Sequence, residues 1–187
     1  MNKRMRLLIA SLMAVGFFVG CSGDADTTTP AVVKTEAKQA IDTTAFNADT
    51  GAVTKDTTIK AGNTGTTMAL TSGTVFQDAS GNAIKKAPVA DVVVKKSATK
   101  ATTTIKFEVD GKKVIPTESV VISVPAPKGA KAGDTVQIEV PDDGSITQKL
   151  IFVVVNADGT VNVRVFPKAF EKTIVIIVEI KKDSSTN

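Results

Sequence analysis

The chain has 187 residues, with no His, Trp or Tyr and a single Cys. Without His it lacks the most common general base at neutral pH and the most common ligand of zinc, copper and haem iron. One Cys excludes an internal disulfide and a thiolate zinc cluster. The formal net charge is +4, and three of the basic residues lie within the first six positions. The remainder is close to neutral, which gives little reason to expect nucleic-acid binding.

Residues 1–20 have the pattern of an export signal. Three basic residues, Lys3, Arg4 and Arg6, precede an uncharged apolar run over residues 7–19. That run falls short of the roughly 20 residues that a helix needs to span a bilayer, but it matches the core of a cleaved signal peptide. The sequence therefore predicts a signal helix that is removed on export.

The apolar run ends in Phe18-Val19-Gly20-Cys21. This resembles the lipobox of bacterial lipoproteins, with Phe18 where Leu is usual. The resemblance implies cleavage after Gly20 and lipidation of Cys21, and two or three acyl chains anchor a protein firmly in a bilayer. Ser22 stands where an Asp retains many lipoproteins at the inner membrane, so the resemblance implies the outer membrane. The alternative is an ordinary cleaved signal, or an anchor helix, with an incidental Cys.

Residues 21–50 are rich in Thr, Ala, Asp and Lys and poor in large apolar residues. Good helix formers occur within residues 31–41, but an isolated helix of that length is marginal in water. We therefore interpret residues 21–50 as the lipidated N-terminus and a flexible tether. A coil of about 30 residues reaches on the order of 30 Å.

Residues 51–182 consist of short runs of Val, Ile and Thr separated by Gly, Asp, Asn and Pro, and residues 183–187 form a polar tail. Turn signals at roughly 8–12-residue spacing are typical of a β-sandwich. Asp110-Gly111 predicts one tight hairpin, and residues 156–159 predict a second between strands 150–155 and 161–165. Residues 173–180 are almost continuously apolar, which predicts a central strand buried on both faces. Further strands are predicted at residues 89–94, 105–109, 112–115, 120–124 and 135–140.

Two stretches resemble immunoglobulin-like domains of bacterial surface proteins. The first is residues 72–82 followed by residues 87–94, and the second contains residues 118–125, 129–136 and 158–161, with Phe170. The closest named groups are ZU5-like and carboxypeptidase-regulatory-like sandwiches. The resemblance implies an all-β, immunoglobulin-like antiparallel β-sandwich, preceded by the cleaved signal helix and the tether. It supplies no catalytic motif.

Two turns carry oxygen ligands at a spacing that suits Ca²⁺. They are Asp78, Ser80 and Asn82 in one turn, and Asn156 with Asp158 in the other. A calcium loop normally adds more carboxylates and a remote bidentate Glu, and the sequence shows no such spacing. Asp and Asn also favour turns because they tolerate left-handed backbone and bond to their own main chain. Turn formation is therefore the preferred interpretation, with calcium as the weaker alternative.

These observations predict a non-catalytic envelope lipoprotein that displays a β-sandwich for structural, adhesive or assembly interactions. The expected partners are the membrane, through the lipid anchor at Cys21, and another envelope protein. We expect no catalytic residue, no cofactor and no nucleic-acid partner. The alternatives are a lipoprotein that binds a small ligand or an ion and, further behind, a hydrolase that works with carboxylates alone.

Overall fold

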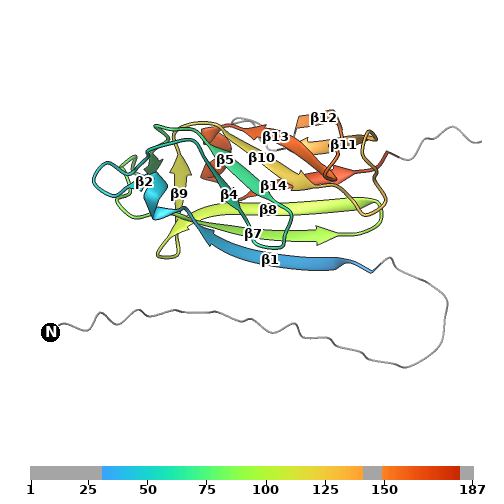
Figure 1. The fold of residues 1–187 in the computed structure, drawn as a ribbon, viewed down its shortest axis with the longest axis horizontal. Coiled ribbons are helices and arrows are strands. Elements are labelled where there is room, and N and C mark those ends of the chain that lie inside the picture. The colour runs from blue at the N-terminus through green and yellow to red at the C-terminus, as the bar shows by residue number, and fades with distance from the viewer. Residues whose placement is uncertain (1–30, 141–148, 182–187) are drawn as a thin grey trace, which may run out of the picture.

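The computed structural model describes residues 31–140 and 149–181. The predicted signal 1–20, Cys21 and the tail 183–187 lie outside the described residues. The described part consists mainly of antiparallel strands with two short 3-10 helices, and it contains no α-helix (Figure 1). The prediction of an all-β fold is confirmed. In the described ranges, no helix has the length and apolar character needed to cross a membrane.

The elements are numbered in chain order. They are β1 (Val33–Ala40), η1 (Thr43–Ala45), β2 (Phe46–Asn47), β3 (Ala52–Val53), β4 (Thr57–Lys60), β5 (Thr67–Leu70), β6 (Phe76–Gln77), β7 (Val89–Lys96), β8 (Lys100–Val109), β9 (Lys112–Pro116), β10 (Val120–Pro125), β11 (Thr135–Val140), β12 (Lys149–Val154), β13 (Thr160–Val165), η2 (Pro167–Glu171) and β14 (Ile174–Glu179).

The strands form an eight-stranded sheet, a four-stranded sheet and a small two-stranded sheet. The large sheet has the order β1-β7-β8-β14-β11-β12, with β9 paired to β8 and β6 paired to β9. The second sheet has the order β13-β10-β5-β4, and β2 pairs with β3. One hydrophobic core contains buried side chains from both larger sheets, such as Val92 and Ile105 from the large sheet and Met68 and Ile122 from the second. Each sheet therefore has an inner face turned to this core.

Strand β14 lies between β8 and β11, so the prediction of a central strand at residues 173–180 is confirmed. Its Ile174, Ile176 and Val178 are fully buried, but the residues between them are only partly buried. The predicted burial on both faces is therefore wrong. An antiparallel sheet needs only one face against the core, and the alternate residues of β14 lie on the outer face.

One predicted hairpin is confirmed and the other is wrong. Asp110 and Gly111 have positive φ angles of 51° and 77° and connect β8 to β9, as a type I′ turn requires. After the second turn, however, β12 pairs with β11 while β13 pairs with β10 in the other sheet. Turn residues reverse the chain, but they do not determine which sheet receives the next strand.

The predicted tether is wrong from Val33 onward. Strand β1 pairs with β7 along its whole length, from Val33 opposite Lys96 to Ala40 opposite Val89. The following residues Ile41, at 1% exposure, and Phe46 belong to the core. The domain therefore includes much of the segment assigned to the tether. An edge strand is held largely by backbone hydrogen bonds, so its sequence needs few large apolar residues.

Candidate functional site

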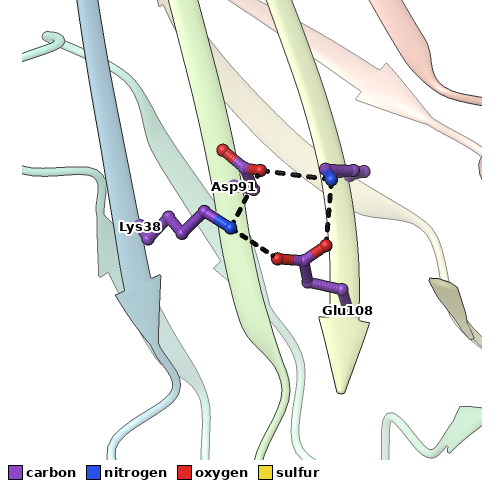
Figure 2. A network of polar contacts seen from close by, with 4 residues as sticks. Lys38, Asp91 and Glu108 are labelled. Atoms are coloured by element: carbon purple, nitrogen blue, oxygen red, sulfur yellow. Dashed lines mark hydrogen bonds and ion pairs between the residues drawn. The ribbon is translucent and has the colours of Figure 1, made fainter. Parts of the chain in front are cut away.

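Four charged side chains form a closed ring on the outer face of the large sheet. They come from three adjacent strands: Lys38 from β1, Asp91 from β7, and Lys106 and Glu108 from β8 (Figure 2). The register places Asp91 directly opposite both Lys38 and Lys106. Opposite charges on neighbouring strands at this spacing attract each other across the sheet.

The ring alternates between positive and negative groups. Lys38 Nζ donates to Glu108 Oε1 at 2.8 Å and lies 3.5 Å from Asp91 Oδ2. Lys106 Nζ lies 2.9 Å from Glu108 Oε2 and 3.2 Å from Asp91 Oδ2. Each carboxylate is thus bound by two ammonium groups, and the four charges compensate one another.

Glu108 is the most buried member of the ring, with 8% exposure. Hydrogen bonds from Lys38 and then Lys106 hold the pKa of its carboxyl below the ordinary value of 4.5. The same contacts raise the pKa of both lysines, and the hydrogen bond to Glu108 is the main cause in each case. Glu108 is therefore ionised at neutral pH and has no proton to give to a substrate. The ring acts as a clamp across three strands.

The first predicted calcium turn is occupied by its own hydrogen bonds. Asp78 Oδ1 accepts the backbone N–H groups of Ser80 at 2.8 Å and of Asn82 at 2.9 Å, and Asp78 Oδ2 accepts the Asn82 amide at 3.3 Å. The bonds from Asn82 are the main reason that the pKa of Asp78 lies below its usual value. The structure brings these three residues together as a turn.

The second turn follows the same pattern. Asp158 Oδ1 accepts the backbone N–H of Thr160 at 3.0 Å and its hydroxyl at 2.6 Å, while Asn156 Nδ2 donates to Thr160 Oγ1 at 3.2 Å. These bonds to Thr160 lower the pKa of Asp158. Across residues 31–140 and 149–181, no three His, Cys, Asp or Glu residues cluster closely enough to hold a metal ion. Both turns are explained by their own backbone geometry.

A hollow of about 280 Å³ lies where β1 begins and β7 ends. Its lining includes Lys96, Lys128, Asn63 and Asp158. Partial burial, and then the charge of Lys128, lower the pKa of Lys96. Two lysines and one carboxylate thus line the hollow. The excess of positive charge favours a small anion over a cation.

The far edge of the same sheet carries an apolar strip. On β12, Leu150, Phe152 and Val154 are 50%, 56% and 59% exposed. They share one face, because side chains two apart on a strand point the same way. Beside them, Lys181 Nζ lies 5.5 Å from the centre of the Phe152 ring. We call Leu150, Phe152 and Val154 the β12 strip.

The sequence interpretation found neither the ring nor the strip. The alternation of Lys106 and Glu108 predicts the polar face of a strand. Lys38, however, falls within residues 21–50, which the sequence predicts to be a tether, and the strand register that places Asp91 beside these residues is not a local property. The uniformly apolar run at residues 150–155 predicted a strand without showing that one face is exposed. Cys21, the predicted lipidation site, lies outside the described residues.

Comparison with protein-family models, with curated proteins and with solved structures found no match to this chain. Its function is therefore argued from its own residues.

Proposed function

We propose that this chain is a bacterial envelope lipoprotein that is anchored through Cys21 and displays a non-catalytic β-domain. The observation that carries the proposal is the lipobox-like Phe18-Val19-Gly20-Cys21, placed between a signal-like N-terminus and a folded domain. Ser22 after the cysteine favours the outer membrane. Two or three acyl chains supply the anchor.

The anchor lies close to the domain. Val33, the first residue of β1, stands 12 positions after Cys21. Twelve residues span at most about 40 Å even when fully extended. The domain is thus held near the membrane surface, where it meets other envelope components.

We further propose that the domain is an immunoglobulin-like β-sandwich serving structural, adhesive or assembly interactions. Two antiparallel sheets that contribute to one core support this arrangement. The ion pairs of Glu108 with Lys38 and Lys106, which lower the pKa of its carboxyl, support a non-catalytic role for the ring, because general acid catalysis needs a carboxyl that keeps its proton near neutral pH. An envelope protein is the expected partner besides the membrane.

A ligand-binding lipoprotein is the alternative. The hollow beside Lys96 and Lys128 favours it, since the unfavourable approach of two ammonium groups is relieved by an anion between them. Binding of phosphate or acetate to the full chain, lost in Lys96→Met and Lys128→Met, would favour this alternative.

The test is metabolic labelling with a fatty acid, followed by detergent partitioning of the full chain. The wild type takes up label and partitions with membranes. Cys21→Ser takes up no label and is released or held only by its uncut signal, while the neighbouring Ser22→Ala keeps both label and membrane association. A wild type that takes up no label and is washed from membranes by salt contradicts the proposal.

A further inference from the structure

The apolar side chains that the domain exposes gather at one of its ends. Among the described residues, the large apolar side chains that are exposed are Val32, Val33, Leu150, Phe152, Val154 and Phe166. All but Phe166 lie at the end where β1 begins with Val33 and β12 finishes with Val154, which we call the anchor end (Figure 1). Exposed apolar patches commonly mark a surface that binds a protein or a membrane.

Strand register connects the β12 strip to the start of β1. One row of paired residues crosses the large sheet from edge to edge, through Val33, Lys96, Ala101, Val178, Ile138 and Ile151. Leu150 and Phe152 flank the last residue of that row. From β1 to β12 the row spans about 24 Å, since neighbouring strands lie about 4.8 Å apart. The strip and the first residue of β1 therefore lie at the same end of the domain.

Phe166 lies at the opposite end. It follows the last residue of β13, whereas the first residue of that strand, Thr160, lines the same hollow as Val33. Phe166 is 49% exposed and Phe152 is 56% exposed. The two rings are thus similar in exposure and differ in the end of the domain at which they lie.

Lysines accompany the strip at the anchor end. Lys34 and Lys95 lie directly opposite each other on β1 and β7, a position in which like charges repel. Lys96 and Lys128 line the hollow at this end, and Lys181 lies beside the strip. An anionic group between two such lysines relieves their repulsion, so these positions suit the phosphate of a lipid headgroup.

The carboxylates at the anchor end leave this positive charge in excess. The five lysines above, with Lys100 and Lys131, outnumber the carboxylates beside them, which are Glu36, Asp134, Glu139, Asp158 and Glu179. Glu36 and Glu179 are moreover paired with Lys34 and Lys100. An apolar strip next to lysines fits the interface of an anionic bilayer, because apolar groups enter the headgroup region while the ammonium groups stay at the phosphates.

We propose that the anchor end docks on the surface of the anionic phospholipid bilayer that holds the lipid anchor, with the β12 strip among the headgroups. The inference rests on the proposed lipidation of Cys21. Val33 stands 12 positions after that cysteine, and such a segment spans at most about 40 Å. The chain enters the domain at the anchor end, so this end stays within that distance of the bilayer.

A polarity-sensitive fluorophore on the strip tests the docking. The full chain is reconstituted into vesicles of phosphatidylethanolamine and phosphatidylglycerol, with the fluorophore on Phe152→Cys or, as the matched control, on Phe166→Cys. The wild type, whose Cys21 is blocked by lipid, measures background labelling. Emission from the Phe152→Cys label is expected to shift to the blue and to be quenched by lipids that carry a nitroxide. Emission from the Phe166→Cys label is expected to stay water-like and unquenched.

Three results would overturn the docking. The first is a water-like Phe152→Cys label, and the second is equal quenching of the two labels. The third is a Phe152→Cys label that shifts to the blue without quenching by nitroxide lipids, which assigns the strip to a protein partner instead.

Charge reversal tests the contribution of the lysines. Adding Lys95→Glu to Phe152→Cys is expected to lower the equilibrium constant for docking, measured by nitroxide quenching, at least about fivefold, because each lysine near an anionic surface is attracted to it. Lys112→Glu, exposed at the opposite end on β9, is the matched control and leaves the quenching unchanged. Equal quenching in anionic vesicles and in vesicles of phosphatidylcholine alone contradicts recognition of anionic lipid.

Folding and lipidation are measured on the same variants. Protease resistance checks that each variant remains folded. Uptake of the fatty-acid label together with an unquenched Phe152→Cys label rejects the docking alone. No uptake of the fatty-acid label rejects the anchor at Cys21, and with it the docking that rests on it.

Discussion

The two edge strands of the large sheet, β1 and β12, differ in the side chains that they expose. At one end, β1 presents Lys34, Glu36 and Lys38, and Lys38 joins the charged ring with Asp91 and Glu108. At the other end, β12 presents Leu150, Phe152 and Val154. Charges tie the first edge to its neighbours and discourage further pairing, whereas the second edge has one charged residue, Lys149 at its start, followed by an exposed apolar row.

The two edges also differ in how they are held to the domain. Strand β1 contributes little apolar surface to the core, so its attachment depends on the ladder to β7 and on the ring. Strand β12 turns Ile151 and Val153 toward the core, and the following Val155 is 2% exposed. Backbone and charge hold β1, while apolar burial on the inner face holds β12.

The largest expected effect comes from removing the charged edge. Deletion of residues 31–40 is expected to lower the free energy of unfolding by at least about 3 kcal/mol, because β7 loses its ladder partner and each such hydrogen bond contributes about 1 kcal/mol. Urea denaturation of the otherwise complete chain measures this. Deletion of residues 22–30 is the control and is expected to change little. Equal stability of the two deletions would restore the tether interpretation for residues 31–40.

The next effect comes from opening the ring. Glu108→Gln removes the charge that binds Lys38 and Lys106 while keeping the shape of the side chain. We expect the free energy of unfolding to fall by about 1–2 kcal/mol at pH 7, since hydrogen bonds to charged groups are stronger than neutral ones. The loss is no larger because the two lysines are exposed and solvent screens their charge. Lys34→Met, outside the ring on the same strand, is the control. A Glu108→Gln chain as stable as the wild type would show that the ring adds nothing.

The contribution of Glu108 to stability is expected to depend on pH. Because the folded-state pKa of Glu108 is lowered, its stabilising contribution is present above the ordinary value of 4.5 and is lost as pH falls through the lower, folded value. The folded-state pKa values of Lys38 and Lys106 are raised. Their stabilising contribution is therefore present below about pH 10.5, the ordinary lysine value, and is lost as the pH rises through the higher, folded values. The difference in free energy of unfolding between wild type and Glu108→Gln, measured by urea denaturation, should therefore be constant from about pH 6 to 9 and should disappear in acid. A gap that widens in acid contradicts this assignment.

The sequence predicted the fold class and most of the strands, because alternation and turn chemistry are local. Residues 105–109 show period-2 alternation, and Asp110-Gly111 has the backbone preference that its turn requires. The partner of each strand was harder to predict. Sequence proximity favours pairing and so predicts a hairpin at residues 156–159, yet β12 and β13 belong to different sheets.

The ring and the strip could not be predicted for a related reason. Both depend on register, which is a non-local property: Lys38 and Glu108 are 70 residues apart and meet only because β1, β7 and β8 are adjacent. Strand β1 itself was missed because residues 33–40 include Ala, Lys, Glu and Gln, which favour helix in isolation. Pairing with β7 overrides that local preference.

The smallest expected effect is at the open edge. Phe152→Thr is expected to lower the free energy of unfolding by only about 0.5–1 kcal/mol, because the ring is more than half exposed and its contact with Lys181 is a surface cation–π interaction. Ile151→Thr, the same kind of change one residue earlier, should cost about 1–2 kcal/mol, since Ile151 packs against the core. Urea denaturation of the full chain measures both variants. The two faces of β12 are then distinguished by two adjacent positions. If Phe152→Thr costs as much as Ile151→Thr, the strip supports the domain from within, and the contrast between a closed edge and an open one no longer holds.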